Sequence, residues 1–291
     1  MTASSARLPV RGRIPSRVRV GVVAVGVAVL AVAATAAVTV PRAVAVPQSR
    51  GGEPFMAGTD MRGTSMRCTA GLVLMDNSVL GGTTEYRRSV RFVLTAGHCG
   101  QVGDRFVTVP EGNVVGDVVW KSPTHDLLLI RVEPRLDRGV DPGCLPGSWT
   151  LPCVAVSAHY YPRAVGRVFT GGPQQSESVP VGGTTQSGVP ICISGGVSGT
   201  ICGHTSAPPP TDYPPDPPDA RDRAFTAGSV GTQPGDSGAP LYSFNGNVFG
   251  IATGIYGEIM DDGSSSIRGV RYTPVSVFFA ETSGYAPAPP G

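Results

Sequence analysis

Short apolar runs separated by turn residues set the pattern of most of the chain. In the first half such runs cover residues 68–75, 90–94, 105–109 and 114–120, and residues 127–132 form a further buried-looking run. Short runs at this spacing are typical of antiparallel β-strands. The 40 glycines and 28 prolines also favour strands and turns over long helices. The pattern therefore predicts an all-β fold built from antiparallel sheet.

The second half carries a clear hairpin signal. The runs 241–244 and 247–251 flank an Asn-Gly pair at residues 245–246, a pair that suits a tight two-residue turn. Pro274 then permits a short helix over residues 275–280, because proline is well tolerated at a helix start. The sequence predicts one hairpin and one terminal helix in this part.

The N-terminus has the profile of an export signal over residues 1–45. Residues 20–40 carry no charge, and the small residues Ala43 and Ala45 suit cleavage after Ala45. The arginines that precede the run are Arg7, Arg11, Arg13, Arg17 and Arg19. The alternative is an uncleaved membrane anchor, since about twenty apolar residues suffice to span a bilayer. Both interpretations place the rest of the chain outside the cell, and the first predicts a secreted protein.

Composition excludes several classes of protein. With 291 residues, 41% hydrophobic and 15% charged, the chain can bury a sizeable core and is not of disordered type. The net charge of +2 is small, and several of the arginines belong to the N-terminal segment. We therefore expect no nucleic-acid partner, and no cofactor.

The motif Gly-Asp-Ser-Gly at residues 235–238 places Ser237 in a tight turn. A serine hydroxyl becomes an effective nucleophile only with a base beside it and with donors that stabilise the oxyanion. The glycines permit the sharp turn, and the amides of Gly235 and Ser237 are candidates for those donors. Standing alone, the motif is equally typical of an ordinary loop.

A candidate base and its orienting acid lie upstream. An apolar strand runs into Thr-Ala-Gly-His-Cys at residues 95–99 and presents His98, and Asp126 opens the apolar run at residues 127–132. A carboxylate bonded to one ring nitrogen of His98 fixes its tautomer and leaves the other nitrogen for the proton of Ser237. A metal site at His125 and Asp126 is disfavoured, because adjacent strand residues point to opposite faces and no ligand cluster completes it.

These motifs, in the order His, Asp, Ser, resemble the chymotrypsin-like serine proteases, most nearly the secreted streptogrisin-type branch of actinobacteria. The resemblance covers roughly residues 68–279. It implies that His98 is the general base, Asp126 its orienter and Ser237 the nucleophile, with oxyanion amides from Gly235 and Ser237. It also implies two antiparallel six-stranded β-barrels with the active site in the cleft between them, and a short C-terminal helix.

The resemblance divides the chain into segments. A linker at residues 46–63 is expected before an N-terminal barrel at 64–150 and a C-terminal barrel at 151–284, and a loose tail at 285–291 follows. The linker shows neither a large pro-region nor a freshly cut apolar N-terminus of the kind that animal relatives use. Asp236 is thus left without the terminal-amine partner of those relatives.

Six cysteines in an exported chain allow 15 pairings. Sequence proximity and the resemblance narrow these to Cys68 with Cys99, Cys144 with Cys153, and Cys192 with Cys202. Zinc binding is disfavoured because no pair of cysteines has the two-residue spacing of zinc sites.

The substrate preference is inferred from the pocket strand that the resemblance places at residues 251–255. It assigns Gly231, Thr253, Gly254 and Ile255 to the primary specificity pocket, with the Thr253 hydroxyl close to Asp126. Gly231 supplies no acid for a basic substrate side chain, and the branched Ile255 shortens the pocket. We expect cleavage after small or medium apolar residues, while the nearby Arg271 keeps an acidic preference open.

The remaining feature is a proline-rich insertion at residues 207–219, which must be extended and exposed. It either flanks the cleft or decorates the surface, and we favour an uninvolved loop. The sequence thus predicts a secreted serine endopeptidase, expected to be a monomer, that acts on protein or peptide substrates. The alternatives are a catalytically silent binding protein on the same scaffold, and an esterase or acyltransferase.

Overall fold

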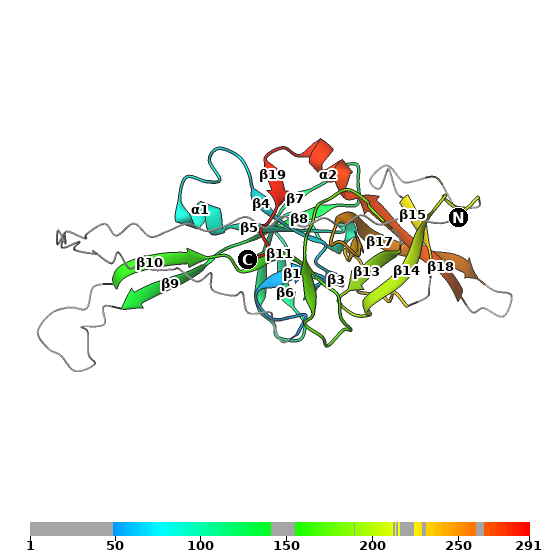
Figure 1. Ribbon diagram of the computed structural model, residues 1–291, viewed down its shortest axis with the longest axis horizontal. Helices are drawn as coiled ribbons and strands as arrows, with labels where there is room; N and C mark the ends of the chain where they lie inside the picture. The colour runs from blue at the N-terminus through cyan, green and yellow to red at the C-terminus, as the bar shows by residue number, and fades with distance from the viewer. Residues whose placement is uncertain are drawn as a thin grey trace, which may run out of the picture. The chain divides into compact units, whose positions relative to one another are not determined.

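The structure is a computed structural model that describes residues 49–140, 155–188, 190–211, 213, 215, 224–228, 231–259 and 265–291. The described part is mainly β-strand, as the short apolar runs predict. Two sheets carry the functional motifs. In Figure 1 the first runs from blue to green and includes one red strand from the C-terminus, and the second runs from yellow-green to orange.

The later sheet is a closed six-stranded antiparallel barrel in the order β13-β14-β15-β18-β17-β16. Its strands are β13 (Ile191–Gly195), β14 (Gly199–Ala207), β15 (Ala224–Ala227), β16 (Pro240–Ser243), β17 (Val248–Ile259) and β18 (Ser265–Pro274). The predicted hairpin is present as β16 and β17, with Gly246 at a φ of 80°, a left-handed conformation that glycine adopts without strain. Its core packs Ile193, Leu241, Phe249 and Tyr272.

The earlier sheet is an eight-stranded, curled half-barrel in the order β19-β4-β5-β8-β7-β6-β2-β3. Its strands are β2 (Asp60–Arg62), β3 (Arg67–Thr69), β4 (Leu72–Asp76), β5 (Arg91–Thr95), β6 (Arg105–Thr108), β7 (Val114–Lys121), β8 (Leu128–Val132) and β19 (Tyr285–Pro287). The predicted double-barrel fold is thus confirmed as a class. In this half eight strands assemble where six were expected, because the three-residue strands β2 and β19 join the sheet, which curls into a half-barrel.

Smaller elements complete the described chain. A three-stranded sheet joins β1 (Phe55–Ala57), β11 (Ala164–Phe169) and β12 (Ser178–Pro180), and β9 (Arg135–Val140) pairs with β10 (Ala155–Tyr161). The helices are α1 (Glu85–Ser89), the 3-10 turn η1 (Gly97–Cys99) and α2 (Val275–Glu281), the last of which follows Pro274 as expected.

Two segments are more ordered than the sequence suggests. The expected linker contains β1 and β2, and the expected loose tail contains β19, which pairs with β4. The reason is that these three-residue strands are too short to show a period of their own and are held by pairing with distant strands.

One apolar core spans both halves and so holds them together. It packs Leu94 and Leu129 of the open sheet with Val248 and Ile251 of the barrel and with Phe278 of α2. The rings of Phe278 and Trp120 meet edge to face with centroids 5.6 Å apart. Strands β5 and β17 are therefore packed through a common core. His98 follows β5, and Ser237 precedes β16, the hairpin partner of β17.

Across the residues that the structure describes, no helix combines the length and the apolar character needed to cross a bilayer.

Candidate active site

His98 and Asp126 meet through two hydrogen bonds. His98 lies in η1, three residues after β5 ends, and Asp126 lies just before β8, which pairs with β5. The backbone N–H of His98 donates to Asp126 Oδ1 over 2.7 Å, and its ring Nδ1 lies 2.8 Å from Asp126 Oδ2. The carboxylate is buried, while the imidazole side chain is 37% exposed. The Nδ1 atom of His98 is thus bonded to the Asp126 carboxylate, and part of the ring remains exposed to solvent.

Gly97 makes this close approach possible. A Cβ at Gly97 would lie only 2.8 Å from the backbone nitrogen of Leu127 and 3.0 Å from Asp126 Oδ1. Any larger residue would push the two loops apart, which explains the glycine in front of His98.

The turn that carries Ser237 rests directly on the end of β5. A Cβ at Gly238 would lie 2.0 Å from Thr95 Oγ1 and 2.2 Å from the Thr69 carbonyl oxygen, so only glycine fits there. The N–H of Thr69 donates to the Ser237 carbonyl over 2.7 Å, and Gly238 donates to the carbonyl of Ala252 in β17 over 2.7 Å. The structure therefore brings the turn of Ser237 against the strand that ends at His98.

The backbone amides of this turn divide into two groups. The N–H of Asp236 donates to Gln233 and that of Gly238 to Ala252. Those of Gly235 and Ser237 donate to no residue that the structure describes. Two amides in one tight turn therefore retain their hydrogen-bonding capacity, which is the requirement for an oxyanion hole.

No hydrogen bond joins the His98 ring to the Ser237 hydroxyl within residues 49–140 and 231–259. The hydrogen bonds of catalytic groups in free enzymes are often long and become short only when substrate is bound. The pairing of Asp126 with the His98 imidazole is therefore formed in this structure, and a hydrogen bond between His98 and Ser237 is not.

The Asp236 carboxylate holds the Ser237 turn in place through hydrogen bonds to the backbone. Its buried carboxylate accepts the backbone N–H groups of Gln233, Val197 and Ser198 over 2.8, 3.0 and 3.1 Å. Thr69 adds a second anchor, because its hydroxyl donates to the Gly235 carbonyl over 2.9 Å. Sequence reasoning noted that Asp236 lacks a terminal-amine partner but did not find these backbone donors.

A buried arginine from the expected linker supports the same region. Arg50 is 2% exposed and donates to the carbonyls of Gly58, Gly171 and Gly172, and to the hydroxyls of Ser194 and Thr200. Burial lowers its pKa to about 10, against the attraction of Tyr242, Asp236 and Asp60. Ser194 lies in β13, two residues before the hairpin turn whose amides bind Asp236, so Arg50 stabilises the hairpin on which the Ser237 turn rests.

The disulfides frame the site. Cys68–Cys99 links β3 to η1 beside His98, and Cys192–Cys202 links β13 to β14. Both are pairs that the sequence resemblance implied. The expected pair Cys144–Cys153 lies outside the described residues.

A pocket of about 140 Å³ opens beside Ser237. Of the expected lining residues Gly254 and Ile255 are present, but Gly231 and Thr253 are not. Gly231 lies instead against Ile201, and Thr253 has a buried hydroxyl with no hydrogen-bond partner among the described residues, so it makes no bond to Asp126. The assignment failed because a register shift between Ala252 and Gly254 alters which β17 residues share a face.

The remaining lining residues are three polar and three apolar ones, Thr232, Gln233, Pro234, Asp236, Ala252 and Val270. Sequence reasoning missed Val270 in particular. No local motif marks Val270, because it enters from β18 through cross-strand pairing with Ile255.

A comparison with protein-family models shows to which family the chain belongs. A family model described as Trypsin matches residues 45–278. The chain belongs to the trypsin family. It is accordingly a serine-type peptidase, and protein or peptide substrates follow from that membership.

Several solved structures resemble this chain. Thermobifida fusca protease A has a TM-score of 0.52 and 17% sequence identity, and the match covers 81% of this chain and 98% of that one. Cellulomonas bogoriensis chymotrypsin has a TM-score of 0.48 and 20% identity, with 81% and 98% covered. Nocardiopsis protease has a TM-score of 0.48 and 17% identity, with 78% and 95% covered. The search of curated proteins found no match.

Proposed function

We propose that this trypsin-family peptidase is a secreted endopeptidase that uses Ser237 as nucleophile, His98 as general base and Asp126 as the acid that orients it. The observation that carries the proposal is the placement of the paired His98 and Asp126 at the end of β5, against which the turn of Ser237 is packed. The two uncommitted amides of that turn support a role in binding the oxyanion.

The chemistry follows from these positions. Ser237 Oγ attacks the peptide carbonyl carbon while the free ring nitrogen of His98 takes the hydroxyl proton. The carbonyl electron pair becomes an oxyanion, which the amides of Gly235 and Ser237 stabilise. His98 then gives its proton to the leaving amine, and the acyl-enzyme forms. Water, deprotonated by His98, hydrolyses that ester and restores Ser237. Asp126 holds the ring and stabilises its positive form throughout.

The small pocket supports a preference for small or medium apolar residues before the scissile bond. Its walls come from Pro234, Ala252, Ile255 and Val270, and it offers no charged side chain other than Asp236, whose carboxylate is bound to backbone amides. A substrate profile dominated by lysine, arginine or glutamate at that position would overturn this part of the proposal.

Export by residues 1–45 completes the proposal. N-terminal sequencing of protein recovered from the culture medium should give a start at Val46. Protein found only in the membrane fraction, with residues 20–40 retained, would replace secretion by anchoring.

The decisive experiment treats the protein with a serine-directed phosphonate and locates the adduct by mass spectrometry. We expect a single label on Ser237 and its loss in Ser237→Ala, together with a fall in turnover of about 10⁶-fold. Ser276→Ala, an exposed serine on α2, is the matched control and should keep full activity. Equal hydrolysis by wild type and Ser237→Ala would remove the mechanism. A folded wild type that neither reacts nor hydrolyses peptides would favour a silent binding protein, and ester hydrolysis without amide hydrolysis would favour an esterase.

A further inference from the structure

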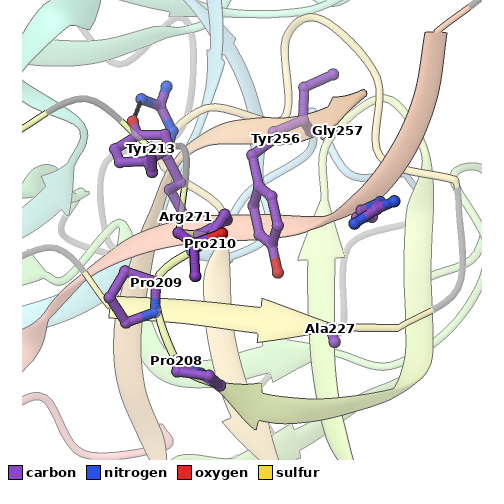
Figure 2. Close-up of a pocket in the computed structure, with 11 residues that line it drawn as sticks. Pro208, Pro209, Pro210, Tyr213, Ala227, Tyr256, Gly257 and Arg271 are labelled. Atoms are coloured by element: carbon purple, nitrogen blue, oxygen red, sulfur yellow. Dashed lines mark hydrogen bonds between the residues drawn. The ribbon is translucent and has the colours of Figure 1, made fainter. Parts of the chain in front are cut away.

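A second, larger pocket of about 680 Å³ adjoins the small one, and Ile255 lines both. Pro208, Pro209 and Pro210 form one wall, and Tyr256 and Arg271 lie across from them, as Figure 2 shows. The described part of the proline-rich insertion is therefore not remote from the cleft. Residues 208–211 thus take the first of the two expected positions, beside the cleft.

Arg271 lines the larger pocket, and its strand neighbour lines the small one. It belongs to β18 and pairs with Gly254 of β17, which lines the small pocket. A Cβ at Gly254 would lie 2.3 Å from Arg271 Nη2. Only glycine therefore leaves room for the guanidinium group beside β17, the strand that supplies residues to both pockets.

The charge of Arg271 has no carboxylate partner among the described residues. Its Nη1 donates to the Tyr213 hydroxyl, and its guanidinium stacks 5.5 Å from the centre of that ring. Its Nε is buried and makes no hydrogen bond within the described chain. Arg268 adds a second cation to the lining, and no described carboxylate lines the pocket. An arginine in this state favours an anionic ligand, because its remaining donors match a carboxylate.

The aromatic wall of the pocket is already formed. Tyr256 donates its hydroxyl hydrogen to the Thr226 carbonyl over 2.9 Å, and Phe225 meets Tyr213 and Tyr256 edge to face with centroids 4.9 and 5.4 Å apart. A wall ordered before binding lowers the entropic cost of holding a ligand.

We propose that the larger pocket is an extended substrate subsite that binds an acidic side chain of the peptide, with Arg271 as the residue that determines this preference. The proposal rests on the proposed function, since it places the subsite beside the pocket of the scissile residue. From Gly254 to Gly257, β17 advances about 10 Å at 3.3 Å per residue. An extended peptide whose scissile residue fills the small pocket would bring a residue two to four positions away to the larger one.

The test uses peptides that carry Glu, Gln or Lys at each of the positions two to four on either side of the scissile bond. With wild type we expect one position at which Glu raises kcat/KM about tenfold over Gln, as one charge-assisted hydrogen bond in a partly exposed site would give. The ratio should fall as salt is added. Arg271→Met should bring it close to one, Arg271→Lys should restore part of it, and Arg271→Glu should favour Lys.

Arg87→Met, which removes an exposed arginine of α1, is the matched control and should keep the wild-type ratio. Phosphonate labelling of Ser237 in every variant separates the two proposals. A protein that reacts at Ser237 but shows no preference for Glu, or a preference that survives Arg271→Met, overturns the subsite alone. A wild type that is not labelled at Ser237 overturns the proposed function on which it rests.

Discussion

The two sides of the candidate site are held by different means. On one side His98 and Asp126 bond to each other directly, and they lie next to the ends of β5 and β8, two neighbouring strands of the open sheet. On the other side the position of Ser237 depends on backbone amides, on Thr69 and on the buried Arg50, which come from distant parts of the chain. The first side depends on one side-chain pair and the second on a network. Loss of a single group should therefore affect chemistry on the first side and order on the second.

The largest effect should come from Asp126→Asn. The amide can still accept from the His98 backbone but cannot hold the ring in the tautomer that accepts a proton from Ser237. We expect kcat to fall about 10⁴-fold, the magnitude known for the same change in a serine-protease triad, with little change in thermal stability. Asp117→Asn, which breaks an exposed ion pair with Arg105, is the control and should keep full activity. A fall in kcat of less than tenfold in Asp126→Asn would show that Asp126 does not orient His98.

Arg50→Met tests the network on the other side. It leaves the carbonyls of Gly58, Gly171 and Gly172 without their buried donor, so we expect the free energy of unfolding to fall by about 3 to 5 kcal/mol. The fraction of molecules that react with a phosphonate should fall as well, while the molecules that react keep normal kinetics.

Arg62→Met, at an exposed position of β2, should change neither quantity. A fully reactive Arg50→Met protein would mean that the nucleophile turn does not depend on the arginine, whatever the loss of stability.

The same contrast separates what the sequence could predict from what it could not. His98, Asp126 and Ser237 were found because each stands in a local motif. The short apolar runs identified most strands of the open sheet. Arg50, Thr69 and Val270 were missed, because their roles depend on contacts with residues far away in sequence. Arg50 in particular stands in a glycine-bearing segment without periodicity, where nothing local indicates a buried side chain.

The pocket shows the same limit. Gly254 and Ile255 were assigned through the family resemblance and do line the pocket, but Thr253 does not, because the sequence carries no sign of the local irregularity in strand pairing. Side-chain direction on an irregular strand therefore requires coordinates.

The two disulfides should contribute differently to each side. The pair Cys68–Cys99 spans 31 residues and Cys192–Cys202 spans 10. Loop entropy then predicts losses of about 3.7 and 2.7 kcal/mol when each is replaced by serines. Only the first replacement should also lower kcat, because Cys99 is adjacent to His98. Denaturant unfolding and peptide assays of the two double variants measure both effects, and equal activity losses would contradict the asymmetry.

The smallest predicted effect is a loss of folding stability at low pH. It arises in the closed barrel and not in the open sheet. His204 of β14 is fully buried with Thr226 Oγ1 3.2 Å from its Nδ1, and burial lowers its pKa. The unfolded chain therefore binds a proton more readily, so the stability that His204 contributes is complete above about pH 6.5 and declines as the pH falls below that value. The slope cannot exceed about 1.4 kcal/mol per pH unit.

Glu281 of α2 behaves differently. Its partial burial raises the pKa, but hydrogen bonds from His125, Ser122 and Thr124 outweigh this and lower it overall. Its contribution is therefore lost only as the pH falls below about 4.5, the ordinary value for glutamate. Unfolding curves between pH 7 and 5 should thus flatten in His204→Leu, whereas the Glu281 carboxylate itself titrates only below this range. An unchanged slope in His204→Leu would show that His204 is not the acid-sensitive group of this pH range.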